Sequence, residues 1–343
     1  MFAFEPFGCT GIDNIISYRR NDLLDYNYTL FFDQEPINME RHQATFDQIV
    51  KYAEPLGHPD RTPGAFVSSE KDSDTVDRIC KHYGWTKHYY FYHGWAALDW
   101  YRGYNQTFLI PEPKNRKITR TFIAPNRIVA GEREHRLVML YHIFKSGMTD
   151  NWISCPETCP AENITVHCAV QSLSGLYPDI TEVFAQQQFP IEFPKETGSP
   201  MHSCWLSLFD QSAESLLYLV TETVASGRRS HLTEKTFKPI CLRMPFVIVG
   251  TCGSLKYLRS YGFKTFSDLW DESYDDEVND IQRIEKIAFT LKTIDILPVD
   301  KKQRLFDMAQ EICEYNYNHF YSGAFEQILW TELTEMLNEL PKI

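Results

Sequence analysis

Residues Tyr218 to Phe266 read YLVTETVASGRRSHLTEKTFKPICLRMPFVIVGTCGSLKYLRSYGFKTF, and this stretch decides the fold. Its first part continues an apolar run, Leu216 to Val220, which predicts a buried strand with Glu222 just after its C-terminal end. A second apolar run, Phe246 to Gly250, predicts another buried strand. A loop and a helix-compatible segment separate the two, which is the order of half a doubly wound α/β domain.

Charged side chains gather where the intervening helix is predicted to begin. Thr233 can cap that helix. The charged residues are Arg228, Arg229, Glu234, Lys235 and Lys238. Ligands of such folds lie outside the carboxyl ends of the strands, so cations at a helix N-terminus there predict a seat for a diphosphate. The alternative is that Glu234 and Lys235 are ordinary solvent-exposed residues of a first helical turn.

The spacing of these residues resembles the donor-site signature of the α-1,3-fucosyltransferase family. Glu222 is followed after a loop by Thr233-Glu234-Lys235 and then by a strand led by Pro245. The family has phenylalanine and asparagine on either side of its glutamate, whereas this chain has Thr221 and Thr223. The resemblance implies a sugar transferase with two Rossmann-like domains facing a cleft (GT-B-like), and it leaves the sugar and the nucleotide base open.

The composition predicts a globular protein in a reducing compartment. At 343 residues, with 43% hydrophobic residues, the chain can bury a large core, and no apolar run is long enough for a membrane span. No signal peptide is evident, and the nine cysteines are odd in number and scattered, so we expect a cytoplasmic location. A formal net charge of −12 argues against nonspecific binding to nucleic acid or acidic membranes.

One group of cysteines leaves a metal site open. Cys155, Cys159, His167 and Cys168 lie close together in the sequence, but their spacing differs from that of the common zinc knuckles. We expect no metal, and whether these four residues bind zinc stays undecided.

The N-terminal part of the chain supplies the candidate catalytic base. Tyr28 to Phe32 predict a strand that runs directly into Asp33 and Glu35, which Pro36 follows. The resemblance implies a catalytic glutamate shortly before a proline, which fits Glu35 and keeps Asp33 as the alternative base. From the residues alone, a helix cap and a turn explain this segment equally well.

Two further features of the N-terminal part have a functional and a structural interpretation. Asp72-Ser73-Asp74 could bind a metal, but it opens a helical pattern and is better explained as a helix N-cap. Tyr89 to Tyr92 predict a strand that ends at His93. His93 is therefore a candidate for the acceptor side, although a lone histidine is more often structural.

A second α/β segment follows. Ile118 to Ile123 predict a strand, with Arg127 shortly after it, and Glu132 to Lys145 predict an amphipathic helix. Arg133 and Arg136 fall in its first turns, where the helix dipole disfavours cations unless an anion is bound. Ion pairs with neighbouring glutamates are the alternative. The resemblance implies a phosphate-binding arginine here, for which Arg136 is the best match and Arg127 the next.

The predicted organisation has three parts: residues 1–112 as an acceptor-side Rossmann-like domain, residues 113–300 as the nucleotide-sugar domain, and residues 301–343 as a helical C-terminal tail. Pro111 to Asn115 mark the linker. Phe263 to Phe266 predict an additional strand.

The predicted function is transfer of a sugar from a nucleoside-diphosphate sugar to an acceptor hydroxyl, with inversion and without a metal or other cofactor. The expected acceptor is a carbohydrate. The cations would hold the diphosphate, Glu222 and Glu234 would orient donor hydroxyls, and Glu35 would deprotonate the acceptor. Two alternatives stay open. The acceptor could be a hydroxyl of a modified nucleic-acid base, given the basic run Lys114 to Arg136, or the chain could be a non-catalytic sugar-binding or scaffold protein.

Overall fold

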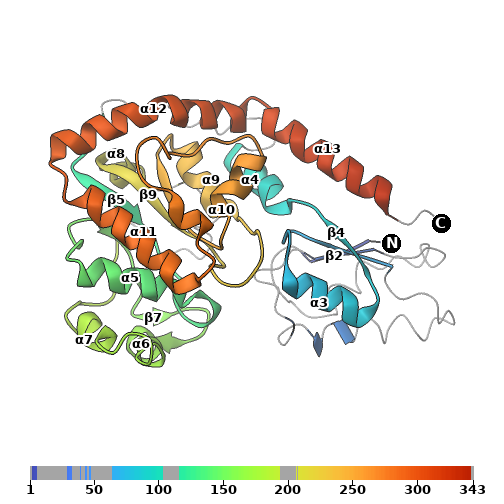
Figure 1. Cartoon of the computed structure of the whole chain (residues 1–343), viewed down its shortest axis with the longest axis horizontal. Helices are drawn as coiled ribbons and strands as arrows, with labels where there is room; N and C mark the ends of the chain where they lie inside the picture. Colours follow the sequence, from blue (N-terminus) through green and yellow to red (C-terminus); the bar gives the residue numbers. More distant parts are fainter. Residues whose placement is uncertain are drawn as a thin grey trace. The chain divides into compact units, whose positions relative to one another are not determined.

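The chain forms two compact α/β units, each built on a parallel sheet (Figure 1). The computed structural model describes residues 2–5, 29–32, 39, 43–44, 46–47, 64–102, 116–193, 206 and 208–340, with backbone only for residues 2–5 and 29–32. Unit 1 comprises Met1–Trp95, Gly227–His231 and Glu326–Ile343, and unit 2 comprises Ala96–Ser226 and Leu232–Phe325. No helix within the described ranges is long and apolar enough to cross a membrane.

The sheet of unit 1 has four parallel strands in the order β1-β2-β3-β4. They are β1 (Phe2–Glu5), β2 (Thr29–Phe32), β3 (Ala65–Ser68) and β4 (Thr86–Tyr89). Helix α3 (Asp74–Tyr83) connects β3 to β4, and α13 (Ala324–Glu339) places Met336 and Leu340 against Ala65 and Val67 of β3. The final helix therefore completes the core of the unit in which the chain begins.

Two sequence-based interpretations in unit 1 have clear outcomes. The N-cap prediction for residues 72–74 is confirmed, because the side chain of Ser73 accepts from the backbone N of Val76 at the start of α3. The strand predicted for residues 89–92 is wrong beyond Tyr89, because helix α4 begins at Tyr92 and ends at Arg102. Within α4, Ala97, Leu98 and Tyr101 are buried, which is a helical spacing that the aromatic run had masked.

Unit 2 has a four-stranded parallel sheet in the order β10-β9-β5-β6. The strands are β5 (Arg120–Ala124), β6 (Trp152–Ile153), β9 (Ser215–Thr221) and β10 (Phe246–Val249). Every residue of β9 is buried, as expected for a central strand covered on both faces. The three strands predicted in this unit from residues 118–123, 216–220 and 246–250 are thus confirmed, with shifted ends.

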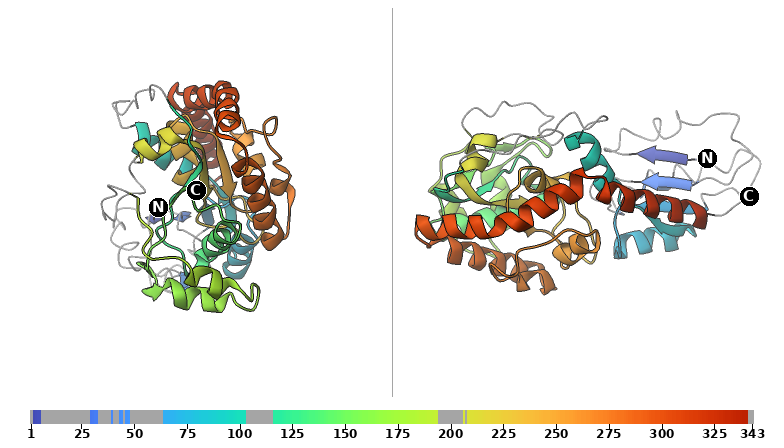
Figure 2. Two further views of the ribbon diagram at one scale, coloured as in Figure 1. Left: turned by 90° about the vertical axis from the view of Figure 1, so that its left-hand side faces the viewer. Right: turned by 90° about the horizontal axis from the view of Figure 1, so that it is seen from above.

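Helices cover both faces of this sheet. α9 (Glu234–Cys241) and α12 (Val299–Tyr321) pack against β9, while α11 (Asp280–Asp295) packs against β5 and α5 (His135–Lys145). Figure 1 shows α12 above β9 and α5 below it. The smaller elements are η3 (Gly131–Arg133), β7 (Thr158–Cys159), β8 (Ile164–Thr165), α6 (Val166–Ser172), α7 (Ile180–Ala185), α8 (Phe209–Glu214), α10 (Ser254–Ser260) and η5 (Ser273–Asp276). α7 packs on α5, and α6 and α7 lie at the margin of the unit (Figure 2).

The strand predicted for residues 263–266 is wrong. Phe263 and Phe266 are buried, but none of the strands in the described part of the chain pairs with this segment. Instead, the side chain of Asn316 accepts from the backbone N of Lys264 at 2.8 Å and donates to its carbonyl at 2.9 Å. One amide side chain thus supplies the two hydrogen bonds that a neighbouring strand would have made.

A buried arginine joins three segments of unit 2. Arg283 on α11 donates to the carbonyl oxygens of Gly250 (2.9 Å), Ala225 (2.5 Å) and Glu277 (2.7 Å). Its guanidinium also pairs with Asp280 at 2.6 Å. Only 2% of the Arg283 side chain is exposed, so these hydrogen bonds offset the cost of burying its charge.

We expect Arg283→Met to destabilise unit 2 by about 3 kcal/mol or more, because it leaves buried carbonyls without donors. The measurement is the denaturation midpoint followed by circular dichroism. The control is Lys286→Met on the same helix, which removes a pair with Glu277 from a side chain that is 47% exposed, and should cost under about 1 kcal/mol. Equal losses in the two variants would contradict the structural role of Arg283.

Candidate functional site

The carboxyl ends of three strands of unit 2 are tied together by polar side chains. Asn126 follows β5, and its backbone N donates to Ser154 Oγ, just after β6, at 3.0 Å. At the end of β9, Thr221 Oγ1 donates to Asn126 Oδ1 at 2.9 Å. These bonds fix one edge of the sheet, which is the edge where ligands bind in parallel α/β folds.

Glu222 lies at this edge, and its carboxylate is fully buried. It accepts from the backbone N of Thr233 at 3.1 Å and from Thr233 Oγ1 at 2.5 Å. It also accepts from Thr236 Oγ1 at 2.6 Å and from the backbone N of Thr223 at 3.2 Å. The anion at the N-terminus of α9 is therefore the protein's own carboxylate, which binds where a phosphate was expected.

Arg136 supports the same strand end from α5. Its guanidinium is buried and donates to the carbonyl oxygens of Ile128 (2.8 Å), Thr221 (3.0 Å) and Glu222 (3.0 Å). The neighbouring His135 places Nε2 2.9 Å from the Glu222 carbonyl oxygen. Carbonyl dipoles thus compensate the unfavourable position of a cation at a helix N-terminus.

Lys235 places an ammonium group at the surface of this edge. Its Nζ donates to Thr223 Oγ1 at 3.0 Å, to Thr233 Oγ1 at 3.3 Å and to Glu234 Oε1 at 2.8 Å. The side chain of Glu234 is only 3% exposed, whereas that of Lys235 is 25% exposed. We call Thr223, Thr233, Glu234 and Lys235 the lysine cluster; within it, Lys235 is the charged group most open to solvent.

Two other residues that were predicted to bind the sugar donor lie outside the lysine cluster. Arg127, after β5, is exposed, and Lys238, on the second turn of α9, is half-buried. The lysine cluster, Arg127 and Lys238 all belong to unit 2.

The arginines of the basic loop belong to unit 1 instead. Arg229 pairs with the buried carboxylate of Glu70 at 3.0 Å, and Arg228 lies 3.7 Å from Asp74. Backbone hydrogen bonds between Lys71 and Ser230, of 3.0 and 2.7 Å, hold the loop beside the segment after β3. These arginines have carboxylate partners within unit 1.

His93 lies in the first turn of α4, not at the end of a strand. Its ring meets that of His231 edge to face, with centroids 5.0 Å apart, and both residues are buried. The sequence had not singled out His231, because an isolated histidine in a basic loop carries no pattern. The other two predicted residues on the acceptor side, Asp33 and Glu35, lie outside the described residues.

The four residues of the possible zinc set differ in accessibility. Cys155 and Cys159 are buried, whereas His167 and Cys168 are exposed. In the described part of the chain, no group of three or more histidine, cysteine, aspartate or glutamate side chains is placed to hold a metal ion.

Comparisons of the chain with protein-family models, with curated proteins and with solved structures gave no match.

We expect Glu222→Gln to lower the free energy of unfolding by about 2 kcal/mol. The glutamine NH₂ group would face the N–H and O–H groups that donate to Glu222. At least one of these buried groups would then lose its acceptor. Chemical denaturation measures the change. Glu214→Gln, on an exposed side chain at the end of α8, is the control and should stay within about 0.5 kcal/mol of wild type. A neutral Glu222→Gln would show that the carboxylate does not hold the edge together.

His135 gives unit 2 a pH-dependent stability. Burial, and then the charge of Arg136, lower the pKa of His135 from 6.5 to about 3. Between pH 6.5 and about 3, the unfolded chain therefore binds a proton on this histidine that the folded chain does not. The contribution of neutral His135 is complete above pH 6.5 and falls by about 1.4 kcal/mol per pH unit as the pH drops toward 3.

His135→Gln should therefore reduce the loss of stability between pH 6.5 and 4, because glutamine can still donate to the Glu222 carbonyl but does not titrate. His142, whose pKa burial lowers to about 4, keeps its own share of that loss. The measurement is the denaturation midpoint as a function of pH. His167→Gln, which changes an exposed histidine, should keep the wild-type slope. An unchanged slope in His135→Gln would refute this account.

Proposed function

We propose that this chain is a glycosyltransferase that binds a nucleoside-diphosphate sugar at the carboxyl edge of the sheet of unit 2. The observation that carries the proposal is the ammonium group of Lys235, held at that edge by two threonine hydroxyls and Glu234. Glycosyl transfer leaves negative charge on the departing diphosphate, and a fixed cation stabilises that charge. The resemblance to the α-1,3-fucosyltransferase signature supports the same assignment.

The contacts refine the roles of the predicted donor residues. Lys235 is the primary phosphate ligand, and the exposed Arg127 and the half-buried Lys238 are its supporting cations. Glu234 is the carboxylate that orients hydroxyls of the donor. Glu222, Thr233 and Arg136 are positioning residues in this proposal, because their polar groups hold the strand end and the start of α9.

The proposal places the acceptor on unit 1, as in GT-B-like enzymes whose two Rossmann-like domains face a cleft. Glu35 or Asp33 would take the proton from the acceptor hydroxyl, and displacement would invert the anomeric centre. In this proposal Arg229 pairs with the buried carboxylate of Glu70 and Arg228 lies beside Asp74, so both arginines hold the loop Gly227–His231 on unit 1. A carbohydrate is the acceptor that the resemblance favours, and the reaction needs no cofactor besides the nucleotide sugar.

The contacts of two arginines in the basic run give the nucleic-acid acceptor no support, although Lys117 and Arg127 of that run are exposed. Within the basic run, Arg136 is buried, and Arg120 pairs with Asp150 and lies 4.7 Å from the centre of the Trp152 ring. These side chains are therefore already engaged. A salt-sensitive gel shift with DNA would favour the nucleic-acid acceptor, and no binding at low salt would exclude it.

We expect a nucleotide sugar to raise the melting temperature of the wild-type chain, because a ligand that binds only the folded state stabilises it. A thermal-shift screen that includes GDP-fucose and UDP-glucose measures this. Lys235→Ala should lose the shift, since it removes the phosphate ligand but no core group. The control is Lys256→Ala, an exposed lysine on α10 that should keep the shift.

Release of nucleoside diphosphate without an acceptor separates an enzyme from a sugar-binding scaffold of the same fold. Slow release by wild type, abolished in Lys235→Ala, supports the enzyme. Binding without release supports the scaffold. No thermal shift with any nucleotide sugar contradicts the donor site itself.

A further inference from the structure

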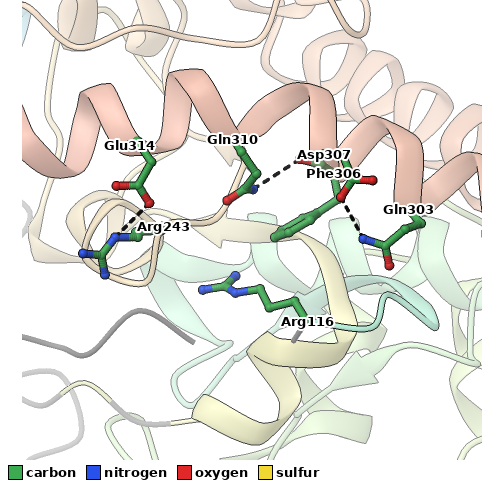
Figure 3. A pocket seen from close by; sticks show the side chains of 7 residues that line it. All are labelled: Arg116, Arg243, Gln303, Phe306, Asp307, Gln310 and Glu314. Atoms are coloured by element: carbon green, nitrogen blue, oxygen red, sulfur yellow. Dashed lines mark hydrogen bonds and ion pairs between the residues drawn. The ribbon is translucent and has the colours of Figure 1, made fainter. Parts of the chain in front are cut away.

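Unit 2 has a second polar site, a pocket of about 190 Å³ beneath α12 (Figure 3). Arg116 precedes β5, and Arg243 precedes β10, so both lie at the amino edge of the parallel sheet, opposite the edge that holds the lysine cluster. The lining consists of Arg116, Arg243, Gln303, Phe306, Asp307, Gln310 and Glu314.

One stripe of α12 supplies most of the lining. Gln303, Asp307, Gln310 and Glu314 are spaced by four, three and four residues, which places them on one face of the helix. Buried residues of the same helix, including Phe306 and Ala309, make the adjacent apolar stripe. α12 thus directs polar side chains into the pocket, beside the apolar stripe with which it packs on the unit.

Arg243 occupies a backbone position that favours glycine. Its φ is +50°, and its N–H and that of Met244 donate to the carbonyls of Ile240 and Pro239, the hydrogen-bond pattern of a Schellman helix end. A side chain is disfavoured there, so the arginine must contribute through its guanidinium. Its Nε lies 2.9 Å from Glu314 Oε1, and its guanidinium carbon lies 3.4 Å from the centre of the Tyr317 ring.

The two ends of the pocket differ in charge. Figure 3 shows the guanidinium of Arg116 directed toward the end that holds Arg243 and Glu314. Arg116 donates to the Leu242 carbonyl, and its guanidinium carbon lies 5.4 Å from the centre of the Phe306 ring. At the other end, Gln303 Nε2 donates to Asp307 Oδ1 at 3.0 Å. One end is therefore rich in guanidinium groups, and the other offers carboxylate and amide groups.

We propose that this pocket binds a small anion that also carries hydroxyl groups, such as a sugar phosphate or a sugar acid. The arginines suit the anionic group, because guanidinium binds phosphate and carboxylate through directed hydrogen bonds. Asp307 and Gln303 suit hydroxyl groups. The pocket, of about 190 Å³, has room for more than a single water molecule.

The charges of the pocket exclude simpler ligands. A bare anion would make no use of the Gln303–Asp307 pair and would meet the charge of Asp307, whereas a cation would meet the guanidinium groups of Arg116 and Arg243. The site is separate from the proposed donor site, so it does not depend on glycosyl transfer.

Isothermal titration calorimetry on the full chain tests the proposal with glucose 6-phosphate and glucuronate as probes, and with glucose and inorganic phosphate as the two partial ligands. At least one of the two complete probes should bind saturably and at least tenfold more tightly than either partial ligand. The probe that binds distinguishes a phosphate from a carboxylate as the anionic group. Arg116→Gln should weaken its binding about tenfold or more, because it removes a charged hydrogen-bond donor.

Arg243→Gly is the sharper variant, because glycine suits the left-handed backbone while the guanidinium is lost. It should fold, as judged by circular dichroism, and its affinity for the probe should fall by about tenfold or more. Arg304→Gln, on an exposed residue of α12 outside the lining, is the control and should bind like wild type. Absence of binding by both complete probes, binding unchanged in Arg243→Gly, or equal binding of inorganic phosphate would each overturn the proposal.

Discussion

The buried carboxylate of Glu222 is the interaction on which the carboxyl edge of unit 2 depends. A buried anion is costly unless hydrogen bonds replace those it made to water. Glu222 meets this condition with two backbone N–H groups and two threonine hydroxyls, which lie on both sides of a loop of about ten residues. The same bonds fix where β9 ends and where α9 begins, and so they position Thr233 and, through it, Lys235.

This constraint changes what the charged residues at the edge can do. Because the start of α9 is already occupied by a carboxylate, a bound diphosphate would depend less on the helix N-terminus and more on the side chain of Lys235. Arg136 on α5 also stabilises this strand end, because its guanidinium donates to the carbonyl oxygens of Thr221 and Glu222. Its burial makes Arg136 a supporting residue of this strand end, whereas Arg127 is exposed.

Much of the fold could be predicted from local pattern. The continuous apolar runs at β9 and β10 indicate strands buried on both faces, and Thr233 and Ser73 indicate helix starts that the structure confirms. At α4 the aromatic run hid a helical spacing, whereas at Lys264 and Arg136 partners distant in sequence decide the arrangement. Asn316 replaces a neighbouring strand at Lys264, and carbonyls from two separate segments take the guanidinium of Arg136.

The sequence predicted which residues form the candidate site better than it predicted which side chains contact one another. Glu222, Thr233, Glu234 and Lys235 are brought together as their spacing suggests, because strand, loop and helix are consecutive. Arg228 and Arg229 lie between them in the chain, yet they pair with carboxylates of unit 1. Sequence proximity could not reveal this, since Glu70 and Asp74 are far from that loop in the chain.

The central claim is that a nucleotide sugar binds at the edge held by Glu222. Hydrogen–deuterium exchange measured by mass spectrometry, with and without saturating GDP-fucose or UDP-glucose, tests it most directly. The account predicts slower exchange with the donor in peptides that cover residues 221–241 and 124–130, and little change in peptides of α11. Protection confined to other segments, or absent with every nucleotide sugar, would contradict it.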